Sequence, residues 1–346
     1  MARRKKNQLG SGSYRVQVYD YTDKAGKRHY KSFTAPTKTE AQEAAEIWRK
    51  NRSRLGGSMT VAKAAESYIR LKESVLSPST VRAYKSYLRN HLSEEAEIGS
   101  TELVRVSQIM LQSFVSDLAR EVSPKTCANV YGLLTATLAM YMPGQSYSVT
   151  LPAKVKPDTN VPTDEELRQL IALADDDMRI AIYLGAFAPL RRGEICALTA
   201  SDVDLIRGTV SVTKSMVMDA GGEWVVKPTP KTYSSNRTVT LPAFVMEELR
   251  GRKGRVFPHT PAYITMSFQK LVKAAGITRR IRFHDTRAYA ASRMLALTVP
   301  DLYGMKRGGW ATPYVMKKHY QDVIDLEEQR QTKKILDYYE KNFKVK

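Results

Sequence analysis

Two stretches that suit neither a packed helix nor a strand divide this chain into three segments. The first is Asn51–Ser58, where Arg, Ser and Gly predominate without apolar periodicity. The second is Gln145–Asn160, which contains Pro152 and Pro157. A chain of 346 residues is expected to form two or three domains. We therefore predict domains at residues 1–56, 59–145 and 161–346.

The first segment has the pattern of a small unit of strands and one helix. Tyr14–Tyr19 alternates as a half-buried strand does, and Arg28–Phe33 follows as a second strand. Thr37 and Glu40 have the spacing of a capping box, which predicts the start of a helix. The segment is rich in Lys and Arg, so we predict a module that grips DNA, with Arg15 and Arg28 in contact. The alternative is a solvated basic tail with a hairpin.

The second segment is predicted to be helical because four helix-start signals precede apolar residues at helical spacing. The signals are Thr60, Ser77-Pro78, Ser107 and Ser123-Pro124. Three basic side chains on these helices are candidate phosphate contacts, and the alternative for each is a solvated helix face. They are Lys85, Arg89 and Lys125.

The net charge of +20 is the outlier of the composition. A charge of this size indicates the class of partner, not the fold. Nucleic acid is the leading candidate, because Lys and Arg that neutralise phosphates release counterions on binding. A merely basic soluble protein is the alternative.

The cysteines and apolar runs indicate a reducing, cytoplasmic location without a membrane. Cys127 and Cys196 lie in apolar helical patterns, so we expect buried free thiols and neither a disulfide nor a zinc site. No apolar run approaches the roughly 18 residues of a membrane span. The basic N-terminus lacks the apolar region of a signal peptide.

The third segment contains a cation-rich set of side chains. His284 and Arg287 are three residues apart, which places both on one face of a helix. Arg191 and Lys231 precede them, and Gly308-Gly309-Trp310 and Tyr320 follow. A set of positively charged side chains that converge on one point is suited to binding an anion.

This order and spacing resembles the catalytic domain of tyrosine recombinases, the family of phage and conjugative-element integrases. The resemblance covers nearly the whole chain. It implies a mainly α fold with small β-sheets (α+β), built from three parts. These are an arm-type DNA-binding domain with a three-stranded sheet and a helix, a helical core-binding domain, and a mixed α/β catalytic domain with a C-terminal tail helix.

The resemblance assigns Arg191 and Lys231 to the reaction. Arg191 matches the family's first catalytic arginine, and a guanidinium offers a fork of donors to two phosphate oxygens. Its neighbour Arg192 points about 100° away on a helix, so only one of the two can face the site. Lys231 matches the lysine that protonates the leaving 5′ oxygen, although Lys214 and Lys227 compete for that role.

The resemblance also assigns the C-terminal part of the motif. Arg287 would complete a clamp of two arginines, and His284 would donate to a phosphate oxygen or help to move a proton. Trp310 stands where most members have a second histidine; its indole donates one hydrogen bond and does not ionise. Tyr320 is the expected nucleophile, with Tyr314 as its rival.

The implied function is an integrase that cuts and rejoins DNA through a 3′-phosphotyrosyl link to integrate or excise a mobile element, without cofactor or metal. The implied partners are double-stranded DNA with core and arm sites, and a homotetramer on that DNA. Members often also use an excision factor and a host DNA-bending protein. The alternatives are a relaxase of the type IB topoisomerase kind and a DNA-binding regulator that does not cut.

Overall fold

The computed structural model describes residues 9, 12–22, 27–54, 59–154, 160–228, 236–317 and 321–343. Contacts divide the chain into two units, one formed by residues 1–76 and 80–155 and the other by residues 77–79 and 156–346. The predicted boundary near residue 56 lies inside the first unit. Among the described residues, no helix is both long and apolar enough to span a membrane.

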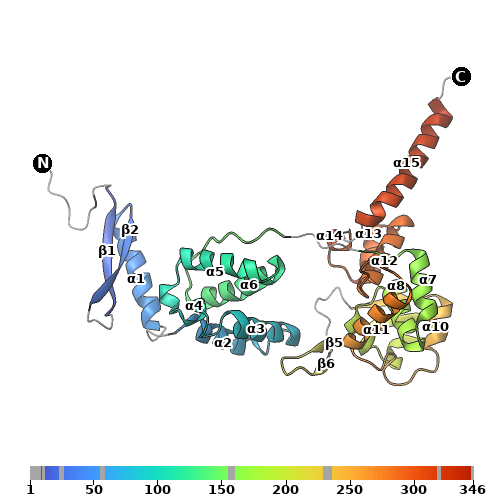
Figure 1. Ribbon diagram of the computed structural model, residues 1–346, viewed down its shortest axis with the longest axis horizontal. Coiled ribbons are helices and arrows are strands. Elements are labelled where there is room, and N and C mark those ends of the chain that lie inside the picture. The colour runs from blue at the N-terminus through green and yellow to red at the C-terminus, as the bar shows by residue number, and fades with distance from the viewer. Residues whose placement is uncertain are drawn as a thin grey trace. The chain divides into compact units, whose positions relative to one another are not determined.

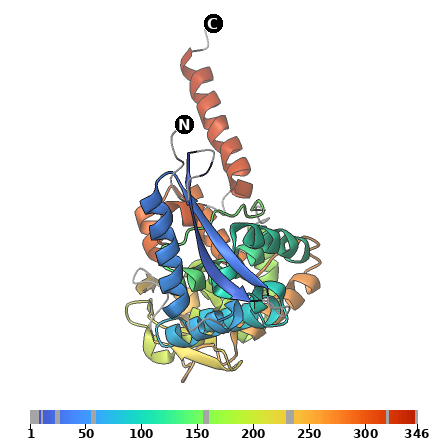
Figure 2. The ribbon, with the colours of Figure 1, turned by 90° about the vertical axis from the view of Figure 1, so that its left-hand side faces the viewer.

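The first unit begins with a hairpin and a helix. Strands β1 (Tyr14–Thr22) and β2 (Arg28–Ala35) pair antiparallel, and α1 (Lys38–Arg54) packs against both (Figures 1 and 2). Val18 and Trp48 form the small core between sheet and helix. The expected capping box is confirmed, since Thr37 and Glu40 each accept a hydrogen bond from the other's backbone NH.

The expectation of three strands in this sheet is not met: the described part of the chain pairs only β1 with β2. The sequence supplies two alternating runs before α1, and one face of the pair is already covered by that helix. Residues 1–8 lie outside the described part.

Helices form the rest of the first unit. Thr60, Ser107 and Ser123 each accept a hydrogen bond at a helix start, which confirms three of the expected caps. Leu92, Leu111 and Leu134 are among the fully buried side chains of the core. The elements are α2 (Val61–Lys72), α3 (Pro78–His91), α4 (Glu97–Ser100), the 3-10 turn η1 (Leu103–Arg105), α5 (Gln108–Glu121) and α6 (Pro124–Tyr141).

The second unit is a helical domain with two small sheets. One sheet has the order β3-β4-β7, and β5 with β6 forms a separate hairpin (Figure 1). Its elements before residue 250 are α7 (Asp164–Leu173), α8 (Asp176–Phe187), α9 (Arg192–Ala197), η2 (Ala200–Asp202), β3 (Val203–Asp204), β4 (Thr209–Val212), β5 (Ser215–Met218), β6 (Trp224–Lys227), β7 (Arg237–Thr240) and α10 (Ala243–Leu249). They are followed by α11 (Pro261–Ala274), α12 (Asp285–Ala296), α13 (Asp301–Gly308), α14 (Pro313–Lys317) and α15 (Gln321–Phe343).

Helix α8 is the centre of this unit, with α7, α9, α10, α11 and α12 in contact with it. Its Gly185 permits a close approach of the segment that starts α12. A Cβ at this position would lie 2.5 Å from Thr286 Oγ1 and 3.0 Å from Phe283 Cζ. The start of α12, with His284 and Arg287, is therefore held near the end of α8, which Arg191 follows in sequence.

Candidate functional site

Arg191 stands at the N-cap of α9 and is fixed there by Glu194. The Glu194 carboxylate accepts from the Arg191 backbone NH at 2.9 Å and from Arg191 Nη1 at 2.7 Å. The Arg191 side chain is 40% exposed, whereas the Glu194 side chain is 2% exposed. The carboxylate thus orients a guanidinium that still reaches solvent. Arg192 instead donates to Thr265 Oγ1 at 2.6 Å, away from this pair.

Arg287 lies on α12 and is almost completely buried, with 3% exposure. Its Nη2 donates to the carbonyl oxygen of Gly308 at 2.9 Å, while its Nε and Nη1 have no hydrogen-bond partner in the part of the chain that the structure describes. Burial lowers the pKa of Arg287 well below that of a free arginine, and the charges of Arg191 and Arg237 lower it further. A buried cation with two free donors is prepared to receive an anion.

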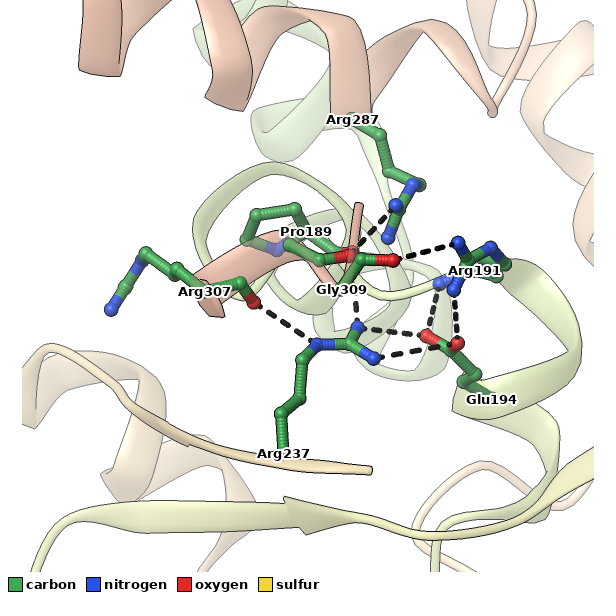
Figure 3. A network of polar contacts seen from close by, with 8 residues as sticks. Pro189, Arg191, Glu194, Arg237, Arg287, Arg307 and Gly309 are labelled. Carbon is green, nitrogen blue, oxygen red and sulfur yellow. Dashed lines mark hydrogen bonds and ion pairs between the residues drawn. The ribbon is translucent and has the colours of Figure 1, made fainter. Parts of the chain in front are cut away.

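The turn after α13 brings the two arginines together. Arg191 Nη2 donates to the Gly309 carbonyl at 3.2 Å, next to the Gly308 carbonyl that Arg287 contacts (Figure 3). Gly309 has φ 63° and ψ 43°, the left-handed conformation that favours glycine at the end of a helix. The next residue, Trp310, is buried and stacks on Arg287, whose Cζ lies 5.0 Å from the ring centroid.

Replacing Gly308 with Ala is expected to displace the Trp310 indole. The added Cβ would lie 1.9 Å from Trp310 Cζ3. Overpacking of this kind should lower the free energy of unfolding by about 1–3 kcal/mol, which urea denaturation measures. Gly132→Ala is the control, because its Cβ meets nothing within 4 Å inside α6. Equal urea midpoints for Gly308→Ala and the parent would contradict the expectation.

His284 stands at the N-cap of α12 and is exposed. It lines a small cavity together with Arg287, Trp310 and Met316. The structure therefore brings His284, Arg287 and Trp310 to one place, and Arg191 meets them through the Gly308-Gly309 turn. Asp285 is buried and accepts from the backbone NH and side chain of Arg282, so it orients the helix start.

Lys231 and Tyr320 lie outside the described residues, so their roles stay predictions. Of their rivals, Lys214 is engaged elsewhere, with Nζ 2.8 Å from Asp202 and 2.8 Å from Thr199 Oγ1. Tyr314 is 74% exposed on α14.

The candidate DNA contacts are all exposed, and their role also stays a prediction. Arg15 and Arg28 lie on the hairpin strands, where the exposed rings of Tyr19 and Tyr30 meet edge to face at 6.0 Å. Lys85 forms an ion pair with Glu73 at 2.8 Å, which competes with a phosphate. Arg89 on α3 and Lys125 on α6 have exposed side chains.

Sequence reasoning missed Arg237, which lies at the centre of the polar network. It starts β7 with 2% side-chain exposure and pairs with Glu194 at 2.9 Å. A signal was present: Arg237 shares the inward-facing register of Val239, because alternate residues of a strand face the same side. An arginine at such an apolar position requires a buried partner.

Comparisons with known proteins agree on one family. A sequence model of the phage integrase family matches residues 161–326. The integrase of Mycobacterium phage L5 is 25% identical over 343 residues, covering 89% of this chain and 91% of the relative. A XerC-like tyrosine recombinase of Caldanaerobacter subterraneus subsp. tengcongensis is 22% identical over 344 residues, covering 84% of this chain and 87% of the relative.

Solved structures share the fold. The Tn1549 transposon integrase in complex with transposon right end DNA matches with a TM-score of 0.65 at 17% identity, covering 79% of this chain and 99% of that one. A lambda integrase dimer bound to a COC′ core site matches with a TM-score of 0.56 at 16% identity, covering 93% of this chain and 97% of the lambda integrase chain.

Proposed function

We propose that this chain, which belongs to the phage integrase family of tyrosine recombinases, is a site-specific recombinase that cleaves and rejoins DNA through a 3′-phosphotyrosyl intermediate. One observation carries the proposal. Arg191 donates to the Gly309 carbonyl and Arg287 to the neighbouring Gly308 carbonyl, and Arg287 keeps two buried donors without a partner among the described residues. Two guanidinium groups held side by side match the oxygens of a phosphodiester.

The buried state of Arg287 sets a condition for DNA binding. The cavity between Arg287, Trp310 and Met316 has a volume of about 10 Å³, too small for a phosphate group. Met316 on α14 and Trp310 must therefore move before a phosphate reaches Arg287.

In the proposed reaction, the Tyr320 phenolate attacks the scissile phosphorus and forms a 3′-phosphotyrosyl bond. The phosphorus–O5′ bond breaks, and Lys231 protonates the departing 5′ oxygen. Arg191, Arg287, His284 and Trp310 stabilise the charge on the phosphoryl oxygens. A 5′-hydroxyl from the partner strand then attacks the link and releases the tyrosine. The phosphotyrosyl bond conserves the energy of the broken bond, so no nucleotide is consumed.

The finer features of this proposal concern partners and biological role. The exposed hairpin face with Arg15 and Arg28 would contact arm-type DNA sites, and Lys85, Arg89 and Lys125 would contact the backbone of core sites. The active form would be a homotetramer on DNA, assisted by an excision factor and a host DNA-bending protein. The element served would be a prophage or an integrative conjugative element, in the cytoplasm of its host.

Replacing Tyr320 with Phe is expected to abolish covalent attachment to DNA, because the ring then has no oxygen to attack phosphorus. We would incubate parent and variant with nicked duplexes from the DNA flanking the gene and with sheared host DNA, then denature and look for DNA-linked protein. Tyr314→Phe is the matched control and should keep full attachment.

The outcomes separate the alternative functions. Attachment by the parent and not by Tyr320→Phe, followed by strand exchange between two labelled duplexes, would support a recombinase. Attachment with relaxation but no exchange would indicate topoisomerase-like activity. Tight binding without attachment to any DNA would indicate a regulator that does not cut. Attachment that survives in Tyr320→Phe would show that the nucleophile is another residue.

A further inference from the structure

Arg237 pairs with the Glu194 carboxylate and also donates hydrogen bonds to two backbone carbonyls, which neutralisation of its charge alone would not require. Its guanidinium donates to Glu194 Oε2 at 2.9 Å, to the Arg307 carbonyl at 3.0 Å and to the Pro189 carbonyl at 3.3 Å (Figure 3). A Cβ added at Gly309 would lie 3.0 Å from Arg237 Nη1, so the αL turn also packs against this guanidinium.

These contacts join three segments that carry the expected site residues. Pro189 and Glu194 flank Arg191, and Arg307 directly precedes the Gly308-Gly309-Trp310 turn. Arg237 itself starts β7, six residues after Lys231. We propose that Arg237 is a positioning residue for DNA cleavage, which sets the relative placement of these three segments without touching the DNA. This inference rests on the proposed function.

A second arginine strengthens the same junction from the other side. Arg307 Nη2 donates to the Phe187 carbonyl at the end of α8, at 2.7 Å, and to the Thr240 carbonyl at the end of β7, at 2.9 Å. The end of α13 is thus tied to α8 and β7 by the Arg307 side chain, and to β7 again by its own carbonyl on Arg237. The Gly308-Gly309-Trp310 turn therefore begins directly after a residue, Arg307, that is held by both α8 and β7.

Arg237 also controls how much charge Arg191 presents. The Glu194 carboxylate is shared, because Arg191 Nη1 lies 2.7 Å from Oε1 and Arg237 Nη2 lies 2.9 Å from Oε2. With Arg237 present, the single negative charge serves two guanidinium groups, and Arg191 keeps positive charge for a phosphate. Without Arg237, the carboxylate would neutralise Arg191 more completely.

The test compares Arg237→Lys with the parent on two versions of the nicked duplex that the parent cleaves. One version has the natural phosphodiester at the scissile position, and the other has a neutral methylphosphonate. A lysine keeps the charge but cannot reproduce the fork of donors to Glu194, Pro189 and Arg307. We expect cleavage of the phosphodiester to slow about 100-fold. The loss on the methylphosphonate should be much smaller, because less negative charge needs stabilisation there.

Two further variants keep the test decisive. Arg250→Lys alters an exposed arginine that pairs with Glu247, and it should leave both rates unchanged. If Arg237→Lys fails to fold, Arg237→Gln keeps amide donors without the charge and leaves Glu194 in place, and the same selective loss is expected.

The results distinguish this inference from the proposed function. Equal losses on the two substrates would show a general structural defect and overturn the positioning role. A variant that cleaves both substrates at the parental rate would overturn it as well, while the recombinase function would stand. A parent protein that forms no adduct with any DNA would instead overturn the proposed function, and this inference with it.

Discussion

Replacing Arg287 with Met is expected to stabilise the folded protein while strongly slowing its covalent attachment to DNA. Arg287 is 3% exposed, and two of its donor nitrogens have no hydrogen-bond partner among the residues that the structure describes. Burial and the charges of Arg191 and Arg237 lower its pKa in the folded chain. A lowered pKa means that folded Arg287 holds its proton more weakly than unfolded Arg287 does. At every pH at which the unfolded arginine is protonated, including neutral pH, the charge of Arg287 therefore opposes folding.

Met fills the same space without a charge. The variant loses the stabilisation from the hydrogen bond to Gly308 and from the stacking on Trp310. It also avoids the free energy that burying a charge requires, which is larger than the stabilisation lost. We expect the free energy of unfolding at neutral pH to rise by about 1–3 kcal/mol. Covalent attachment to DNA should slow by roughly 10³-fold, because a principal donor to the phosphate is gone. Urea denaturation and the rate of adduct formation are the two measurements.

Arg282→Met provides a control from the same motif with the opposite sign. The Arg282 side chain is 43% exposed and pairs with Asp285, whose side chain is 2% exposed, at 3.0 Å. Its removal leaves a buried carboxylate with fewer partners, so the protein should lose about 1–3 kcal/mol of stability. If Arg287→Met destabilises the protein as much as Arg282→Met does, the charge of Arg287 is already well compensated and the prediction is wrong.

Local signals made much of the fold predictable from the sequence. Thr37, Thr60, Ser107 and Ser123 cap helices where the sequence predicts, because capping depends on residues only three positions apart. Residues 209–213 and 237–241 alternate in the way that predicts a strand, and β4 and β7 form there, since alternation is visible within a few residues. The hairpin of β5 and β6 was not anticipated, although Asp219-Ala220-Gly221-Gly222 between the two strands has the composition of a turn.

The candidate site was predictable as a set of residues but not as an arrangement. The motif gave the order of Arg191, His284, Arg287 and Trp310. It could not show that Arg191 and Arg287 donate to two consecutive carbonyls, because the contact from Arg191 to Gly309 joins residues 118 positions apart. It could not show that Trp310 and Met316 cover Arg287 either. The burial of Arg287 and the convergence of the site residues depend on the packing of α12 on α8 and of α13 on α12 and β7, which no local pattern encodes.

Replacing Glu194 with Gln is expected to cause a large loss of stability with a characteristic pH dependence. The Glu194 side chain is 2% exposed, and its carboxylate receives hydrogen bonds from Arg191 and Arg237. Gln keeps the shape but leaves three neighbouring arginines without a negative charge. We expect the free energy of unfolding at pH 7 to fall by about 3–5 kcal/mol.

The pH dependence follows from the direction of the Glu194 pKa shift. Burial alone would raise the pKa, but the charges of Arg237 and Arg191 outweigh it, so the pKa in the folded chain lies below its usual value. An acid with a lowered folded pKa stabilises the fold above its unfolded pKa of about 4.3, and this stabilisation is lost as the pH falls through the folded pKa. The difference between parent and Glu194→Gln should therefore be full at pH 7 and shrink progressively below about pH 4.

Urea denaturation of both proteins across this pH range measures the difference. Glu247→Gln is the matched control, because Glu247 pairs with Arg250 at the surface with 66% side-chain exposure. Exposed pairs contribute little, so this control should change stability by no more than about 0.5 kcal/mol at any pH. If the difference in free energy of unfolding between the parent and Glu194→Gln stays constant down to acid pH, the Glu194 side chain acts through its shape and not its charge. The charge-sharing step by which Arg237 is proposed to act on Arg191 would then lose its basis.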